Sequence, residues 1–242
     1  MALYRIADFT IDIKNRYEHT ALQCAAYRAP EGSTPDFSVE VTEDEIDASL
    51  AEVGKFSRGY HESISVYRKL CTEILHHGGM LMHAAVVGVD GCAYAFSAKS
   101  KTGKSTHISL WRECFGERVT VINGDKPILR VRDGKIYAYG TPWCGKEGWN
   151  TNTCAPLTAL CFLERSPENY IRPLESAEAL DRIMHQLLRP RGLEEMDLTL
   201  QFTDLLLRTV PTFVLGCNIS HEAAELSFRT LTGVKGENRY EN

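Results

Sequence analysis

The sequence predicts an α/β fold with a mixed sheet that contains hairpins, preceded by a small α+β segment. Two apolar runs, residues 80–89 and 92–97, flank Asp90-Gly91, a dipeptide that is typical of a tight turn, and together they predict a β-hairpin. The second arm leads through a polar loop into a helix expected over residues 105–115. Further short apolar strands and amphipathic helices follow as far as residue 232, as in an α/β domain.

Residues 1–79 predict the α+β lead-in. Strands are expected over residues 3–13 and 37–41, where apolar and polar side chains partly alternate. Thr42, followed three residues later by glutamate, is typical of a capping box that opens a helix. A longer amphipathic helix is expected over residues 57–77 and ends at two glycines.

Residues 80–232 are expected to form the main domain, and the polar residues 233–242 a frayed tail. Beyond the hairpin and the helix that follows it, the same patterns predict five strands and three helices. The strands are expected over residues 119–123, 128–132, 135–139, 157–163 and 212–217, and the helices over residues 177–188, 196–208 and 221–232.

Composition narrows the class of protein. The chain has 242 residues, a formal net charge of −5 and a pI near 5.9, which argues against a broad surface for nucleic acid or an anionic membrane. Its N-terminus has no apolar signal region, and it contains no apolar run of 18 residues. Eight scattered cysteines include no C-x-x-C pair. We therefore expect a cytoplasmic protein with reduced thiols.

The polar loop after the hairpin carries the pattern A-x-x-x-x-G-K-S-T, the Walker A pattern of a phosphate loop with alanine in its first position. Such a loop turns backbone N–H groups toward phosphate oxygens in front of a helix N-terminus. Lys104 is expected to reach the β- and γ-phosphates of ATP or GTP, and the hydroxyl of Ser105 to bind Mg²⁺. The expected nucleotide-binding residues are Ala98, Lys99, Ser100, Lys101, Thr102, Gly103, Lys104, Ser105 and Thr106.

A phosphate loop needs a carboxylate near its magnesium ion. Asp125 follows the predicted strand 119–123, whose end is expected beside the loop in an alternating sheet. Asp125 is therefore the candidate second metal ligand, with Ser105, and a candidate catalytic group. Asp133 is a weaker candidate, because an Asp-Gly pair at a hairpin turn needs no further explanation.

Several segments together resemble one family. The segments His83–Val87, Asp90-Gly91, Phe96–Ala98 and Gly103–Ser105, followed by the strand that ends at Asp125, are similar to the core of the HPr kinase/phosphorylase family, which is related to the phosphoenolpyruvate carboxykinases. The resemblance implies a hairpin that leads into the phosphate loop. It also implies that His83 lies near the transferred phosphoryl group, that Asp125 acts as metal ligand or general base, and that the acceptor is a serine. Gly124 stands where the family has a second aspartate.

Two other segments offer weaker candidates for substrate binding. The segment 140–152 is a long loop rich in tryptophan and glycine, in which Trp143 and Lys146 would contact substrate, or else anchor the loop through hydrophobic packing. Arg189 and Arg191 follow a predicted helix and would stabilise a phosphoryl group, or else form a basic helix end.

Together these patterns predict an ATP-dependent kinase in which Asp125, His83 and Lys104 are catalytic. The acceptor would be a hydroxyl, best matched by a serine of a peptide, a protein or a small metabolite. Two alternatives stay open, a nucleotide-binding regulator with little turnover and a carboxykinase-type enzyme that acts on a small carboxylic acid. The partners are a nucleotide and a hydroxyl-bearing substrate, and the oligomeric state is left open, a homo-oligomer included.

Overall fold

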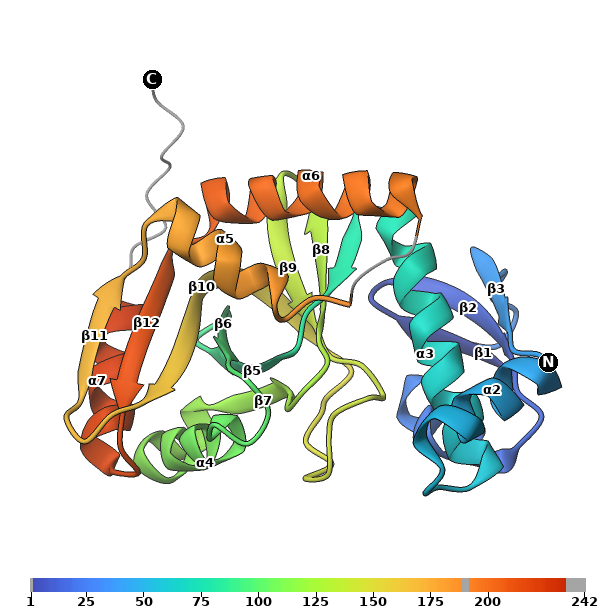
Figure 1. Cartoon of the computed structure of the whole chain (residues 1–242), viewed down its shortest axis with the longest axis horizontal. Helices are drawn as coiled ribbons and strands as arrows, with labels where there is room; N and C mark the ends of the chain where they lie inside the picture. The colour runs from blue at the N-terminus through green and yellow to red at the C-terminus, as the bar shows by residue number, and fades with distance from the viewer. Residues whose placement is uncertain (1, 189–191, 234–242) are drawn as a thin grey trace. The chain divides into compact units, whose positions relative to one another are not determined.

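The computed structural model describes residues 2–188 and 192–233 (Figure 1). The chain forms two compact units, Met1–His77 and Gly78–Asn242. The mixed α/β class predicted from the sequence is confirmed, with a three-stranded sheet in the first unit and a nine-stranded mixed sheet in the second.

The first unit begins with a hairpin. Strands β1 (Leu3–Ile6) and β2 (Phe9–Lys14) pair antiparallel, and β3 (Phe37–Glu40) adds to β2 in parallel. The single strand expected over residues 3–13 is therefore wrong. The chain reverses at Ala7 and Asp8, whose φ angles of 52° and 65° are those of a two-residue hairpin turn. The sequence does not reveal this turn, because it contains none of the usual turn glycines.

Three helices complete this unit, α1 (Glu18–Gln23), α2 (Glu43–Val53) and α3 (Arg58–His76). The predicted capping box is confirmed. The backbone N–H of Glu45 donates to Oγ1 of Thr42 at 3.3 Å, and the N–H of Thr42 donates to the Glu45 carboxylate at 2.8 Å.

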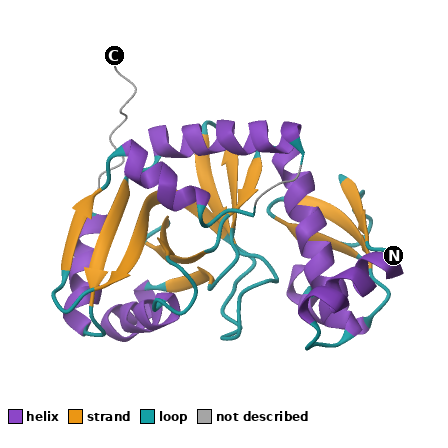
Figure 2. Ribbon diagram, viewed as in Figure 1, coloured by secondary structure: helices purple, strands orange, loops and turns teal. Residues whose placement is uncertain are grey.

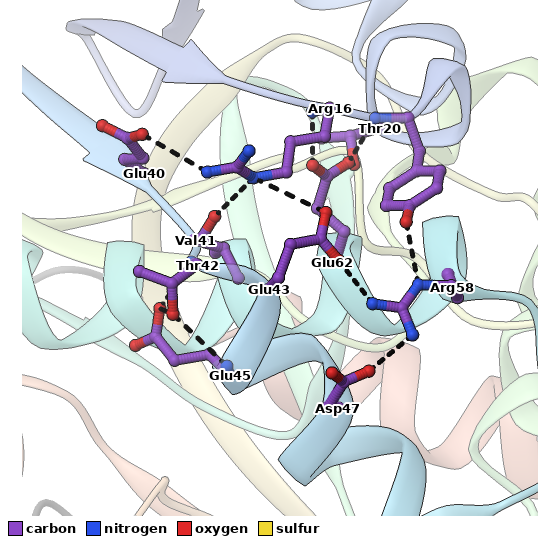
Figure 3. A network of polar contacts seen from close by, with 11 residues as sticks. Arg16, Thr20, Glu40, Val41, Thr42, Glu43, Glu45, Asp47, Arg58 and Glu62 are labelled. Atoms are coloured by element: carbon purple, nitrogen blue, oxygen red, sulfur yellow. Dashed lines mark hydrogen bonds and ion pairs between the residues drawn. The ribbon is translucent and has the colours of Figure 1, made fainter.

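Glu62 of α3 ties that helix to the start of α1 and to the segment that leads into it from β2 (Figure 3). Its side chain is fully buried and accepts hydrogen bonds from the N–H of Arg16 at 2.5 Å, the N–H of Tyr17 at 3.2 Å and the hydroxyl of Thr20 at 2.9 Å. These donors lie at the start of α1, where N–H groups lack partners within the helix. Glu62 therefore caps α1 from another element, and its negative charge faces the positive end of that helix.

We predict that Glu62→Gln destabilises the first unit by about 2 kcal/mol, because the amide has a single acceptor oxygen and turns an N–H group toward donors. Native-state amide exchange in residues 16–23, together with urea unfolding of the full chain, measures the loss. The control is Glu43→Gln, which removes only exposed ion pairs to Arg16 and Arg58 and should cost less than about 0.5 kcal/mol. Equal effects of the two changes would contradict the capping role.

The second unit contains one large sheet with the strand order β4-β8-β9-β10-β6-β5-β7. Strand β12 pairs with β10, and β11 pairs with β12. The β5–β6 hairpin is confirmed, but β5 begins only at Ala84, because residues 79–81 form a separate strand that pairs with β8. The strands are β4 (Gly79–Leu81), β5 (Ala84–Val89), β6 (Cys92–Ser97), β7 (Thr120–Asn123), β8 (Ile128–Arg132), β9 (Lys135–Tyr139), β10 (Cys154–Arg165), β11 (Tyr170–Pro173) and β12 (Thr212–Cys217).

Strand direction decides where the loops of this sheet meet. Strand β6 is parallel to β10, and β10 to β12, whereas β5 is antiparallel to both β6 and β7. The carboxyl ends of β6, β7, β10 and β12 therefore lie at one edge of the sheet, together with the start of β5. This edge is where an open α/β sheet usually binds ligands.

Helices cover both faces of the sheet (Figure 2). On one face α4 (Lys104–Phe115) and α7 (His221–Thr232) pack through Trp111 and Phe228 against alternate residues of β5, β6, β10 and β12. On the other face lies α5 (Ser176–Met184), whose Arg182 stands over the ring of Phe162. Helix α6 (Leu193–Thr209) packs against α5 and contacts β4 and β9.

The predicted helices are found with shifted ends. Helix α5 ends at Met184 rather than at residue 188, and α6 begins at Leu193 rather than at residue 196. Within the described ranges, 2–188 and 192–233, no helix combines the length and the apolar character that a membrane span requires.

Candidate functional site

Strand β6 leads directly into the loop 98–103, which leads into α4. The backbone of this loop takes positive φ angles at Lys101 (65°) and Gly103 (130°). The angle at Gly103 requires glycine, because a side chain there would strain the backbone. Helix α4 begins at the next residue, so its first N–H groups have no acceptor within the helix and its positive end faces the loop. This arrangement suits an anion.

Arg165, at the end of β10, holds the loop from the neighbouring strand. Its Nη2 donates to the carbonyl of Lys101 at 2.6 Å, and its Nε to the carbonyl of Thr102 at 3.4 Å. These contacts fix the backbone at its left-handed turn. The sequence gives no role to Arg165, because the contact joins segments more than 60 residues apart in the chain.

Lys104, His83 and Asp125, predicted to act together, are in contact at the sheet edge. Nζ of Lys104 lies 2.8 Å from Nε2 of His83 and donates to the carbonyl of Ala98 at 3.3 Å. The same His83 nitrogen lies 3.1 Å from Oδ1 of Asp125. Strand β7, which ends at Asn123, is separated from β6 by β5. His83 at the start of β5 therefore bridges the lysine and the aspartate.

Burial and neighbouring charges shift the pKa values of Lys104 and Asp125. Burial lowers the pKa of Lys104, and the charge of Asp125 opposes that shift only in part. For Asp125, burial alone would raise the pKa, but hydrogen bonds from His83 and Lys126 and the charges of those groups outweigh it. The pKa of Asp125 therefore lies well below its usual range, and the carboxylate is ionised at neutral pH.

His83 is held from behind by Gln186, which follows α5. The N–H of His83 donates to the Gln186 carbonyl at 2.8 Å, and Nδ1 of the ring lies 3.0 Å from the Gln186 amide oxygen. Nδ1 can donate to that oxygen, and Nε2 faces both Lys104 and Asp125. The hydroxyl of Ser97 donates to the carbonyl of His83 at 2.8 Å. Gln186 was missed in the sequence, because nothing in the pattern of residues 177–188 relates it to His83.

Asn123 fixes the turn that carries Asp125. Its buried side-chain oxygen accepts from the N–H of Asp125 at 2.9 Å and from that of Lys126 at 2.6 Å. Its amide nitrogen donates to the carbonyls of Thr141 at 3.1 Å and Trp143 at 3.3 Å. The turn is thereby joined to the loop 140–152.

The same loop explains the glycine that precedes Asp125. The N–H of Gly124 donates to the carbonyl of Trp149 at 2.8 Å. A Cβ atom at residue 124 would lie 2.9 Å from the carbonyl oxygen of Cys144 and 3.3 Å from that of Trp149. An aspartate at this position would therefore require the loop backbone to shift.

The weaker candidates lie in different surroundings. Trp143 is 2% exposed, which favours a role in anchoring the loop over contact with substrate. The side chain of Lys146 is 91% exposed, and its ammonium lies 3.9 Å from Glu147. Burial raises the pKa of Cys144, so this thiol is not an activated nucleophile. Arg189 and Arg191 lie outside the described residues.

Over residues 2–188 and 192–233, no group of three or more His, Cys, Asp and Glu side chains could hold a metal ion. A magnesium ion bound with a nucleotide needs fewer protein ligands, because phosphates and water supply the others. Ser105 lies in the first turn of α4, next to Lys104, and Asp125 offers an ionised carboxylate. A hydroxyl and a carboxylate are oxygen donors of the kind that Mg²⁺ prefers, so the pair fits the ion.

No family model matches the chain, and no curated protein matches it in sequence. Among solved structures, it is similar to the Hpr(Ser) kinase/phosphatase from Coxiella burnetii, with 10% sequence identity and a TM-score of 0.37. The match covers 63% of this chain and 88% of that one. A likeness this distant carries no argument about activity.

The lowered pKa of Asp125 predicts how stability depends on pH. Because the folded-state pKa lies below the unfolded value of about 3.9, the stabilisation is complete above that value and is lost as the pH falls toward the folded-state pKa. We expect the difference in unfolding free energy between the wild type and Asp125→Asn to be constant from pH 5 to 7 and to shrink below about pH 4. Urea unfolding at each pH measures it, and a difference that does not change with pH would contradict the assignment.

Proposed function

We propose that the protein is an ATP-dependent phosphotransferase. The observation that carries this proposal is that Lys104 contacts the His83–Asp125 pair. Lys104 is the first residue of α4 and directly follows the loop 98–103. Phosphoryl transfer requires charges that bind the phosphates and orient the acceptor. One edge of the sheet provides them here: a buried ammonium, an ionised carboxylate and a helix N-terminus.

In the proposed reaction Lys104 and the N–H groups of the loop bind the β- and γ-phosphates, and Ser105 and Asp125 hold Mg²⁺. The acceptor oxygen forms a bond to the γ-phosphorus as the bond to the β–γ bridging oxygen breaks, and ADP leaves with that electron pair. The acceptor proton passes to Asp125 or to Nε2 of His83. Because the pKa of Asp125 is low, this carboxylate is better suited to orient the hydroxyl than to deprotonate it, and a loose transition state requires little base strength.

The acceptor we propose is a hydroxyl, and a serine of a peptide, a protein or a small metabolite is the choice that the family resemblance favours. The nucleotide is ATP, with GTP as the alternative. We also propose that the protein acts in the cytoplasm, on the evidence of the sequence alone.

A second candidate function is a nucleotide-binding regulator with little turnover. Two observations favour it. Gly124 is packed so closely against the loop 140–152 that a second carboxylate does not fit there without a shift, and Lys126 already pairs with Asp125. Both features limit the acidic groups that are available to a metal ion or an acceptor.

The test measures ADP release from Mg·ATP by the full chain, with and without a pool of serine peptides and metabolites. We expect acceptor-dependent turnover in the wild type. In Lys104→Ala the turnover should fall at least about 100-fold, because the positive charge that stabilises the transferred phosphoryl group is lost. Lys135→Ala, which removes an exposed lysine in the β8–β9 hairpin, is the matched control and should match the wild type.

ATP binding without turnover under all of these conditions would favour the regulator. Wild-type turnover in Lys104→Ala would contradict both candidate functions, because both place the phosphates on this lysine.

A further inference from the structure

A cavity of about 560 Å³ lies beside the loop 98–103, on the face of the sheet that α4 covers. Gly103, at the N-cap of α4, and Thr106, His107 and Leu110 of that helix line it. Their spacing of three, four and seven residues places them on one face of that helix. The cavity therefore starts at the turn where the loop enters α4 and continues along the helix.

We propose that this cavity binds the nucleoside part of the nucleotide. The inference rests on the proposed function, since it takes the loop as the site of the phosphates. Lys101, Thr102 and Gly103 line the cavity at the head of α4, so a group attached to phosphates bound there lies next to it. The loops after β10 and β12 form its other wall, through Pro167, Asn218 and Ile219.

The wall chemistry suits a planar heterocycle. Leu110, Pro167 and Ile219 offer apolar surface, and Ile219, which is 81% exposed, is free to pack against a ligand. His107 is only 3% exposed, and its Nε2 lies 3.0 Å from the hydroxyl of Ser227, so its polar edge is already satisfied within the protein.

One polar group at the rim is held in place before any ligand binds. The side-chain nitrogen of Asn218 donates to the carbonyl of Pro167 at 3.1 Å, and its N–H donates to the side-chain oxygen of Asn169 at 3.0 Å. A rigid amide beside apolar walls matches the few fixed polar groups that orient a ligand in such cavities.

The other cavity beside the loop is less suited to a base. It measures about 920 Å³ and lies on the α5 face. Arg182, Glu164 and Glu178 line it, and the guanidinium of Arg182 forms ion pairs with Glu164 at 2.7 Å and Glu178 at 3.0 Å. A nucleobase bound there would cover these charged groups. They would lose hydrating water without gaining a new hydrogen-bond partner.

The test compares Mg·ATP with inorganic tripolyphosphate, which carries the phosphates but no nucleoside, by calorimetric titration of the full chain. We expect Ile219→Ser to weaken ATP binding about tenfold, since a buried aliphatic contact of about 1.4 kcal/mol is lost. Binding of tripolyphosphate should stay within about twofold of the wild type. Ile219 is exposed, so the change does not threaten folding. Arg182→Ala, in the other cavity, is the matched control and should leave both affinities unchanged.

Photolabelling with 8-azido-ATP, followed by peptide mapping, gives an independent result. Label on residues 106–110 or 217–219 supports the proposal. Label on residues 178–186, with ATP affinity unchanged in Ile219→Ser, overturns the proposed nucleoside site. In that case, loss of tripolyphosphate binding in Lys104→Ala would still support the phosphate loop. If neither ATP nor tripolyphosphate binds to the wild type, the proposed function fails together with this inference.

Discussion

The buried ammonium group of Lys104 is the constraint on which the rest of the site depends. A charged group that is only 8% exposed is costly unless other groups replace the water that it loses. Here the carbonyl of Ala98 accepts a hydrogen bond from it, Nε2 of His83 lies 2.8 Å away, and the charges of Asp125 and Glu147 favour its protonated form. Since these groups come from four separate segments, the lysine is stabilised only when the sheet edge is assembled.

The strand order supplies that assembly. Placing β5 between β6 and β7 brings the start of one strand between the ends of two others. His83 can then touch both Lys104, which follows the loop, and Asp125, which lies two residues beyond β7. In a sheet where β6 and β7 were direct neighbours, no β5 residue would stand between them. The hairpin is thus the feature that makes a histidine part of this edge.

The loop 140–152 adds a second constraint, because it fixes the turn that holds Asp125. Asn123 and Gly124 both bond to the backbone of this loop, and the buried Trp143 anchors it. A loop that reads as a substrate-binding segment in the sequence therefore also has a structural role. The same packing leaves no room for a side chain at Gly124, next to Asp125, unless the loop backbone shifts.

Local signals made much of the fold predictable. Asp90-Gly91 marks the hairpin, Thr42 and Glu45 mark the start of α2, and the strand pairs around Asp133 follow the alternation of apolar side chains. The β1–β2 turn was missed because Ala7 and Asp8 adopt left-handed angles without glycine.

The candidate site was predictable only in part. Its motif residues have a recognisable spacing, so Lys104, Ser105 and Asp125 could be named together with His83. Arg165 and Gln186 could not be found, because each acts through a contact between segments far apart in the chain. Contacts of this kind follow from the sheet topology, which the spacing of residues does not specify.

The most direct test of the account is a crystal structure of the full chain with Mg²⁺ and a non-hydrolysable ATP analogue. The account predicts that Nζ of Lys104 leaves His83 and lies within hydrogen-bonding distance of a β- or γ-phosphate oxygen, with Ser105 and Asp125 at the metal. A nucleotide bound elsewhere, with Lys104 still against His83 and Ala98, would contradict it.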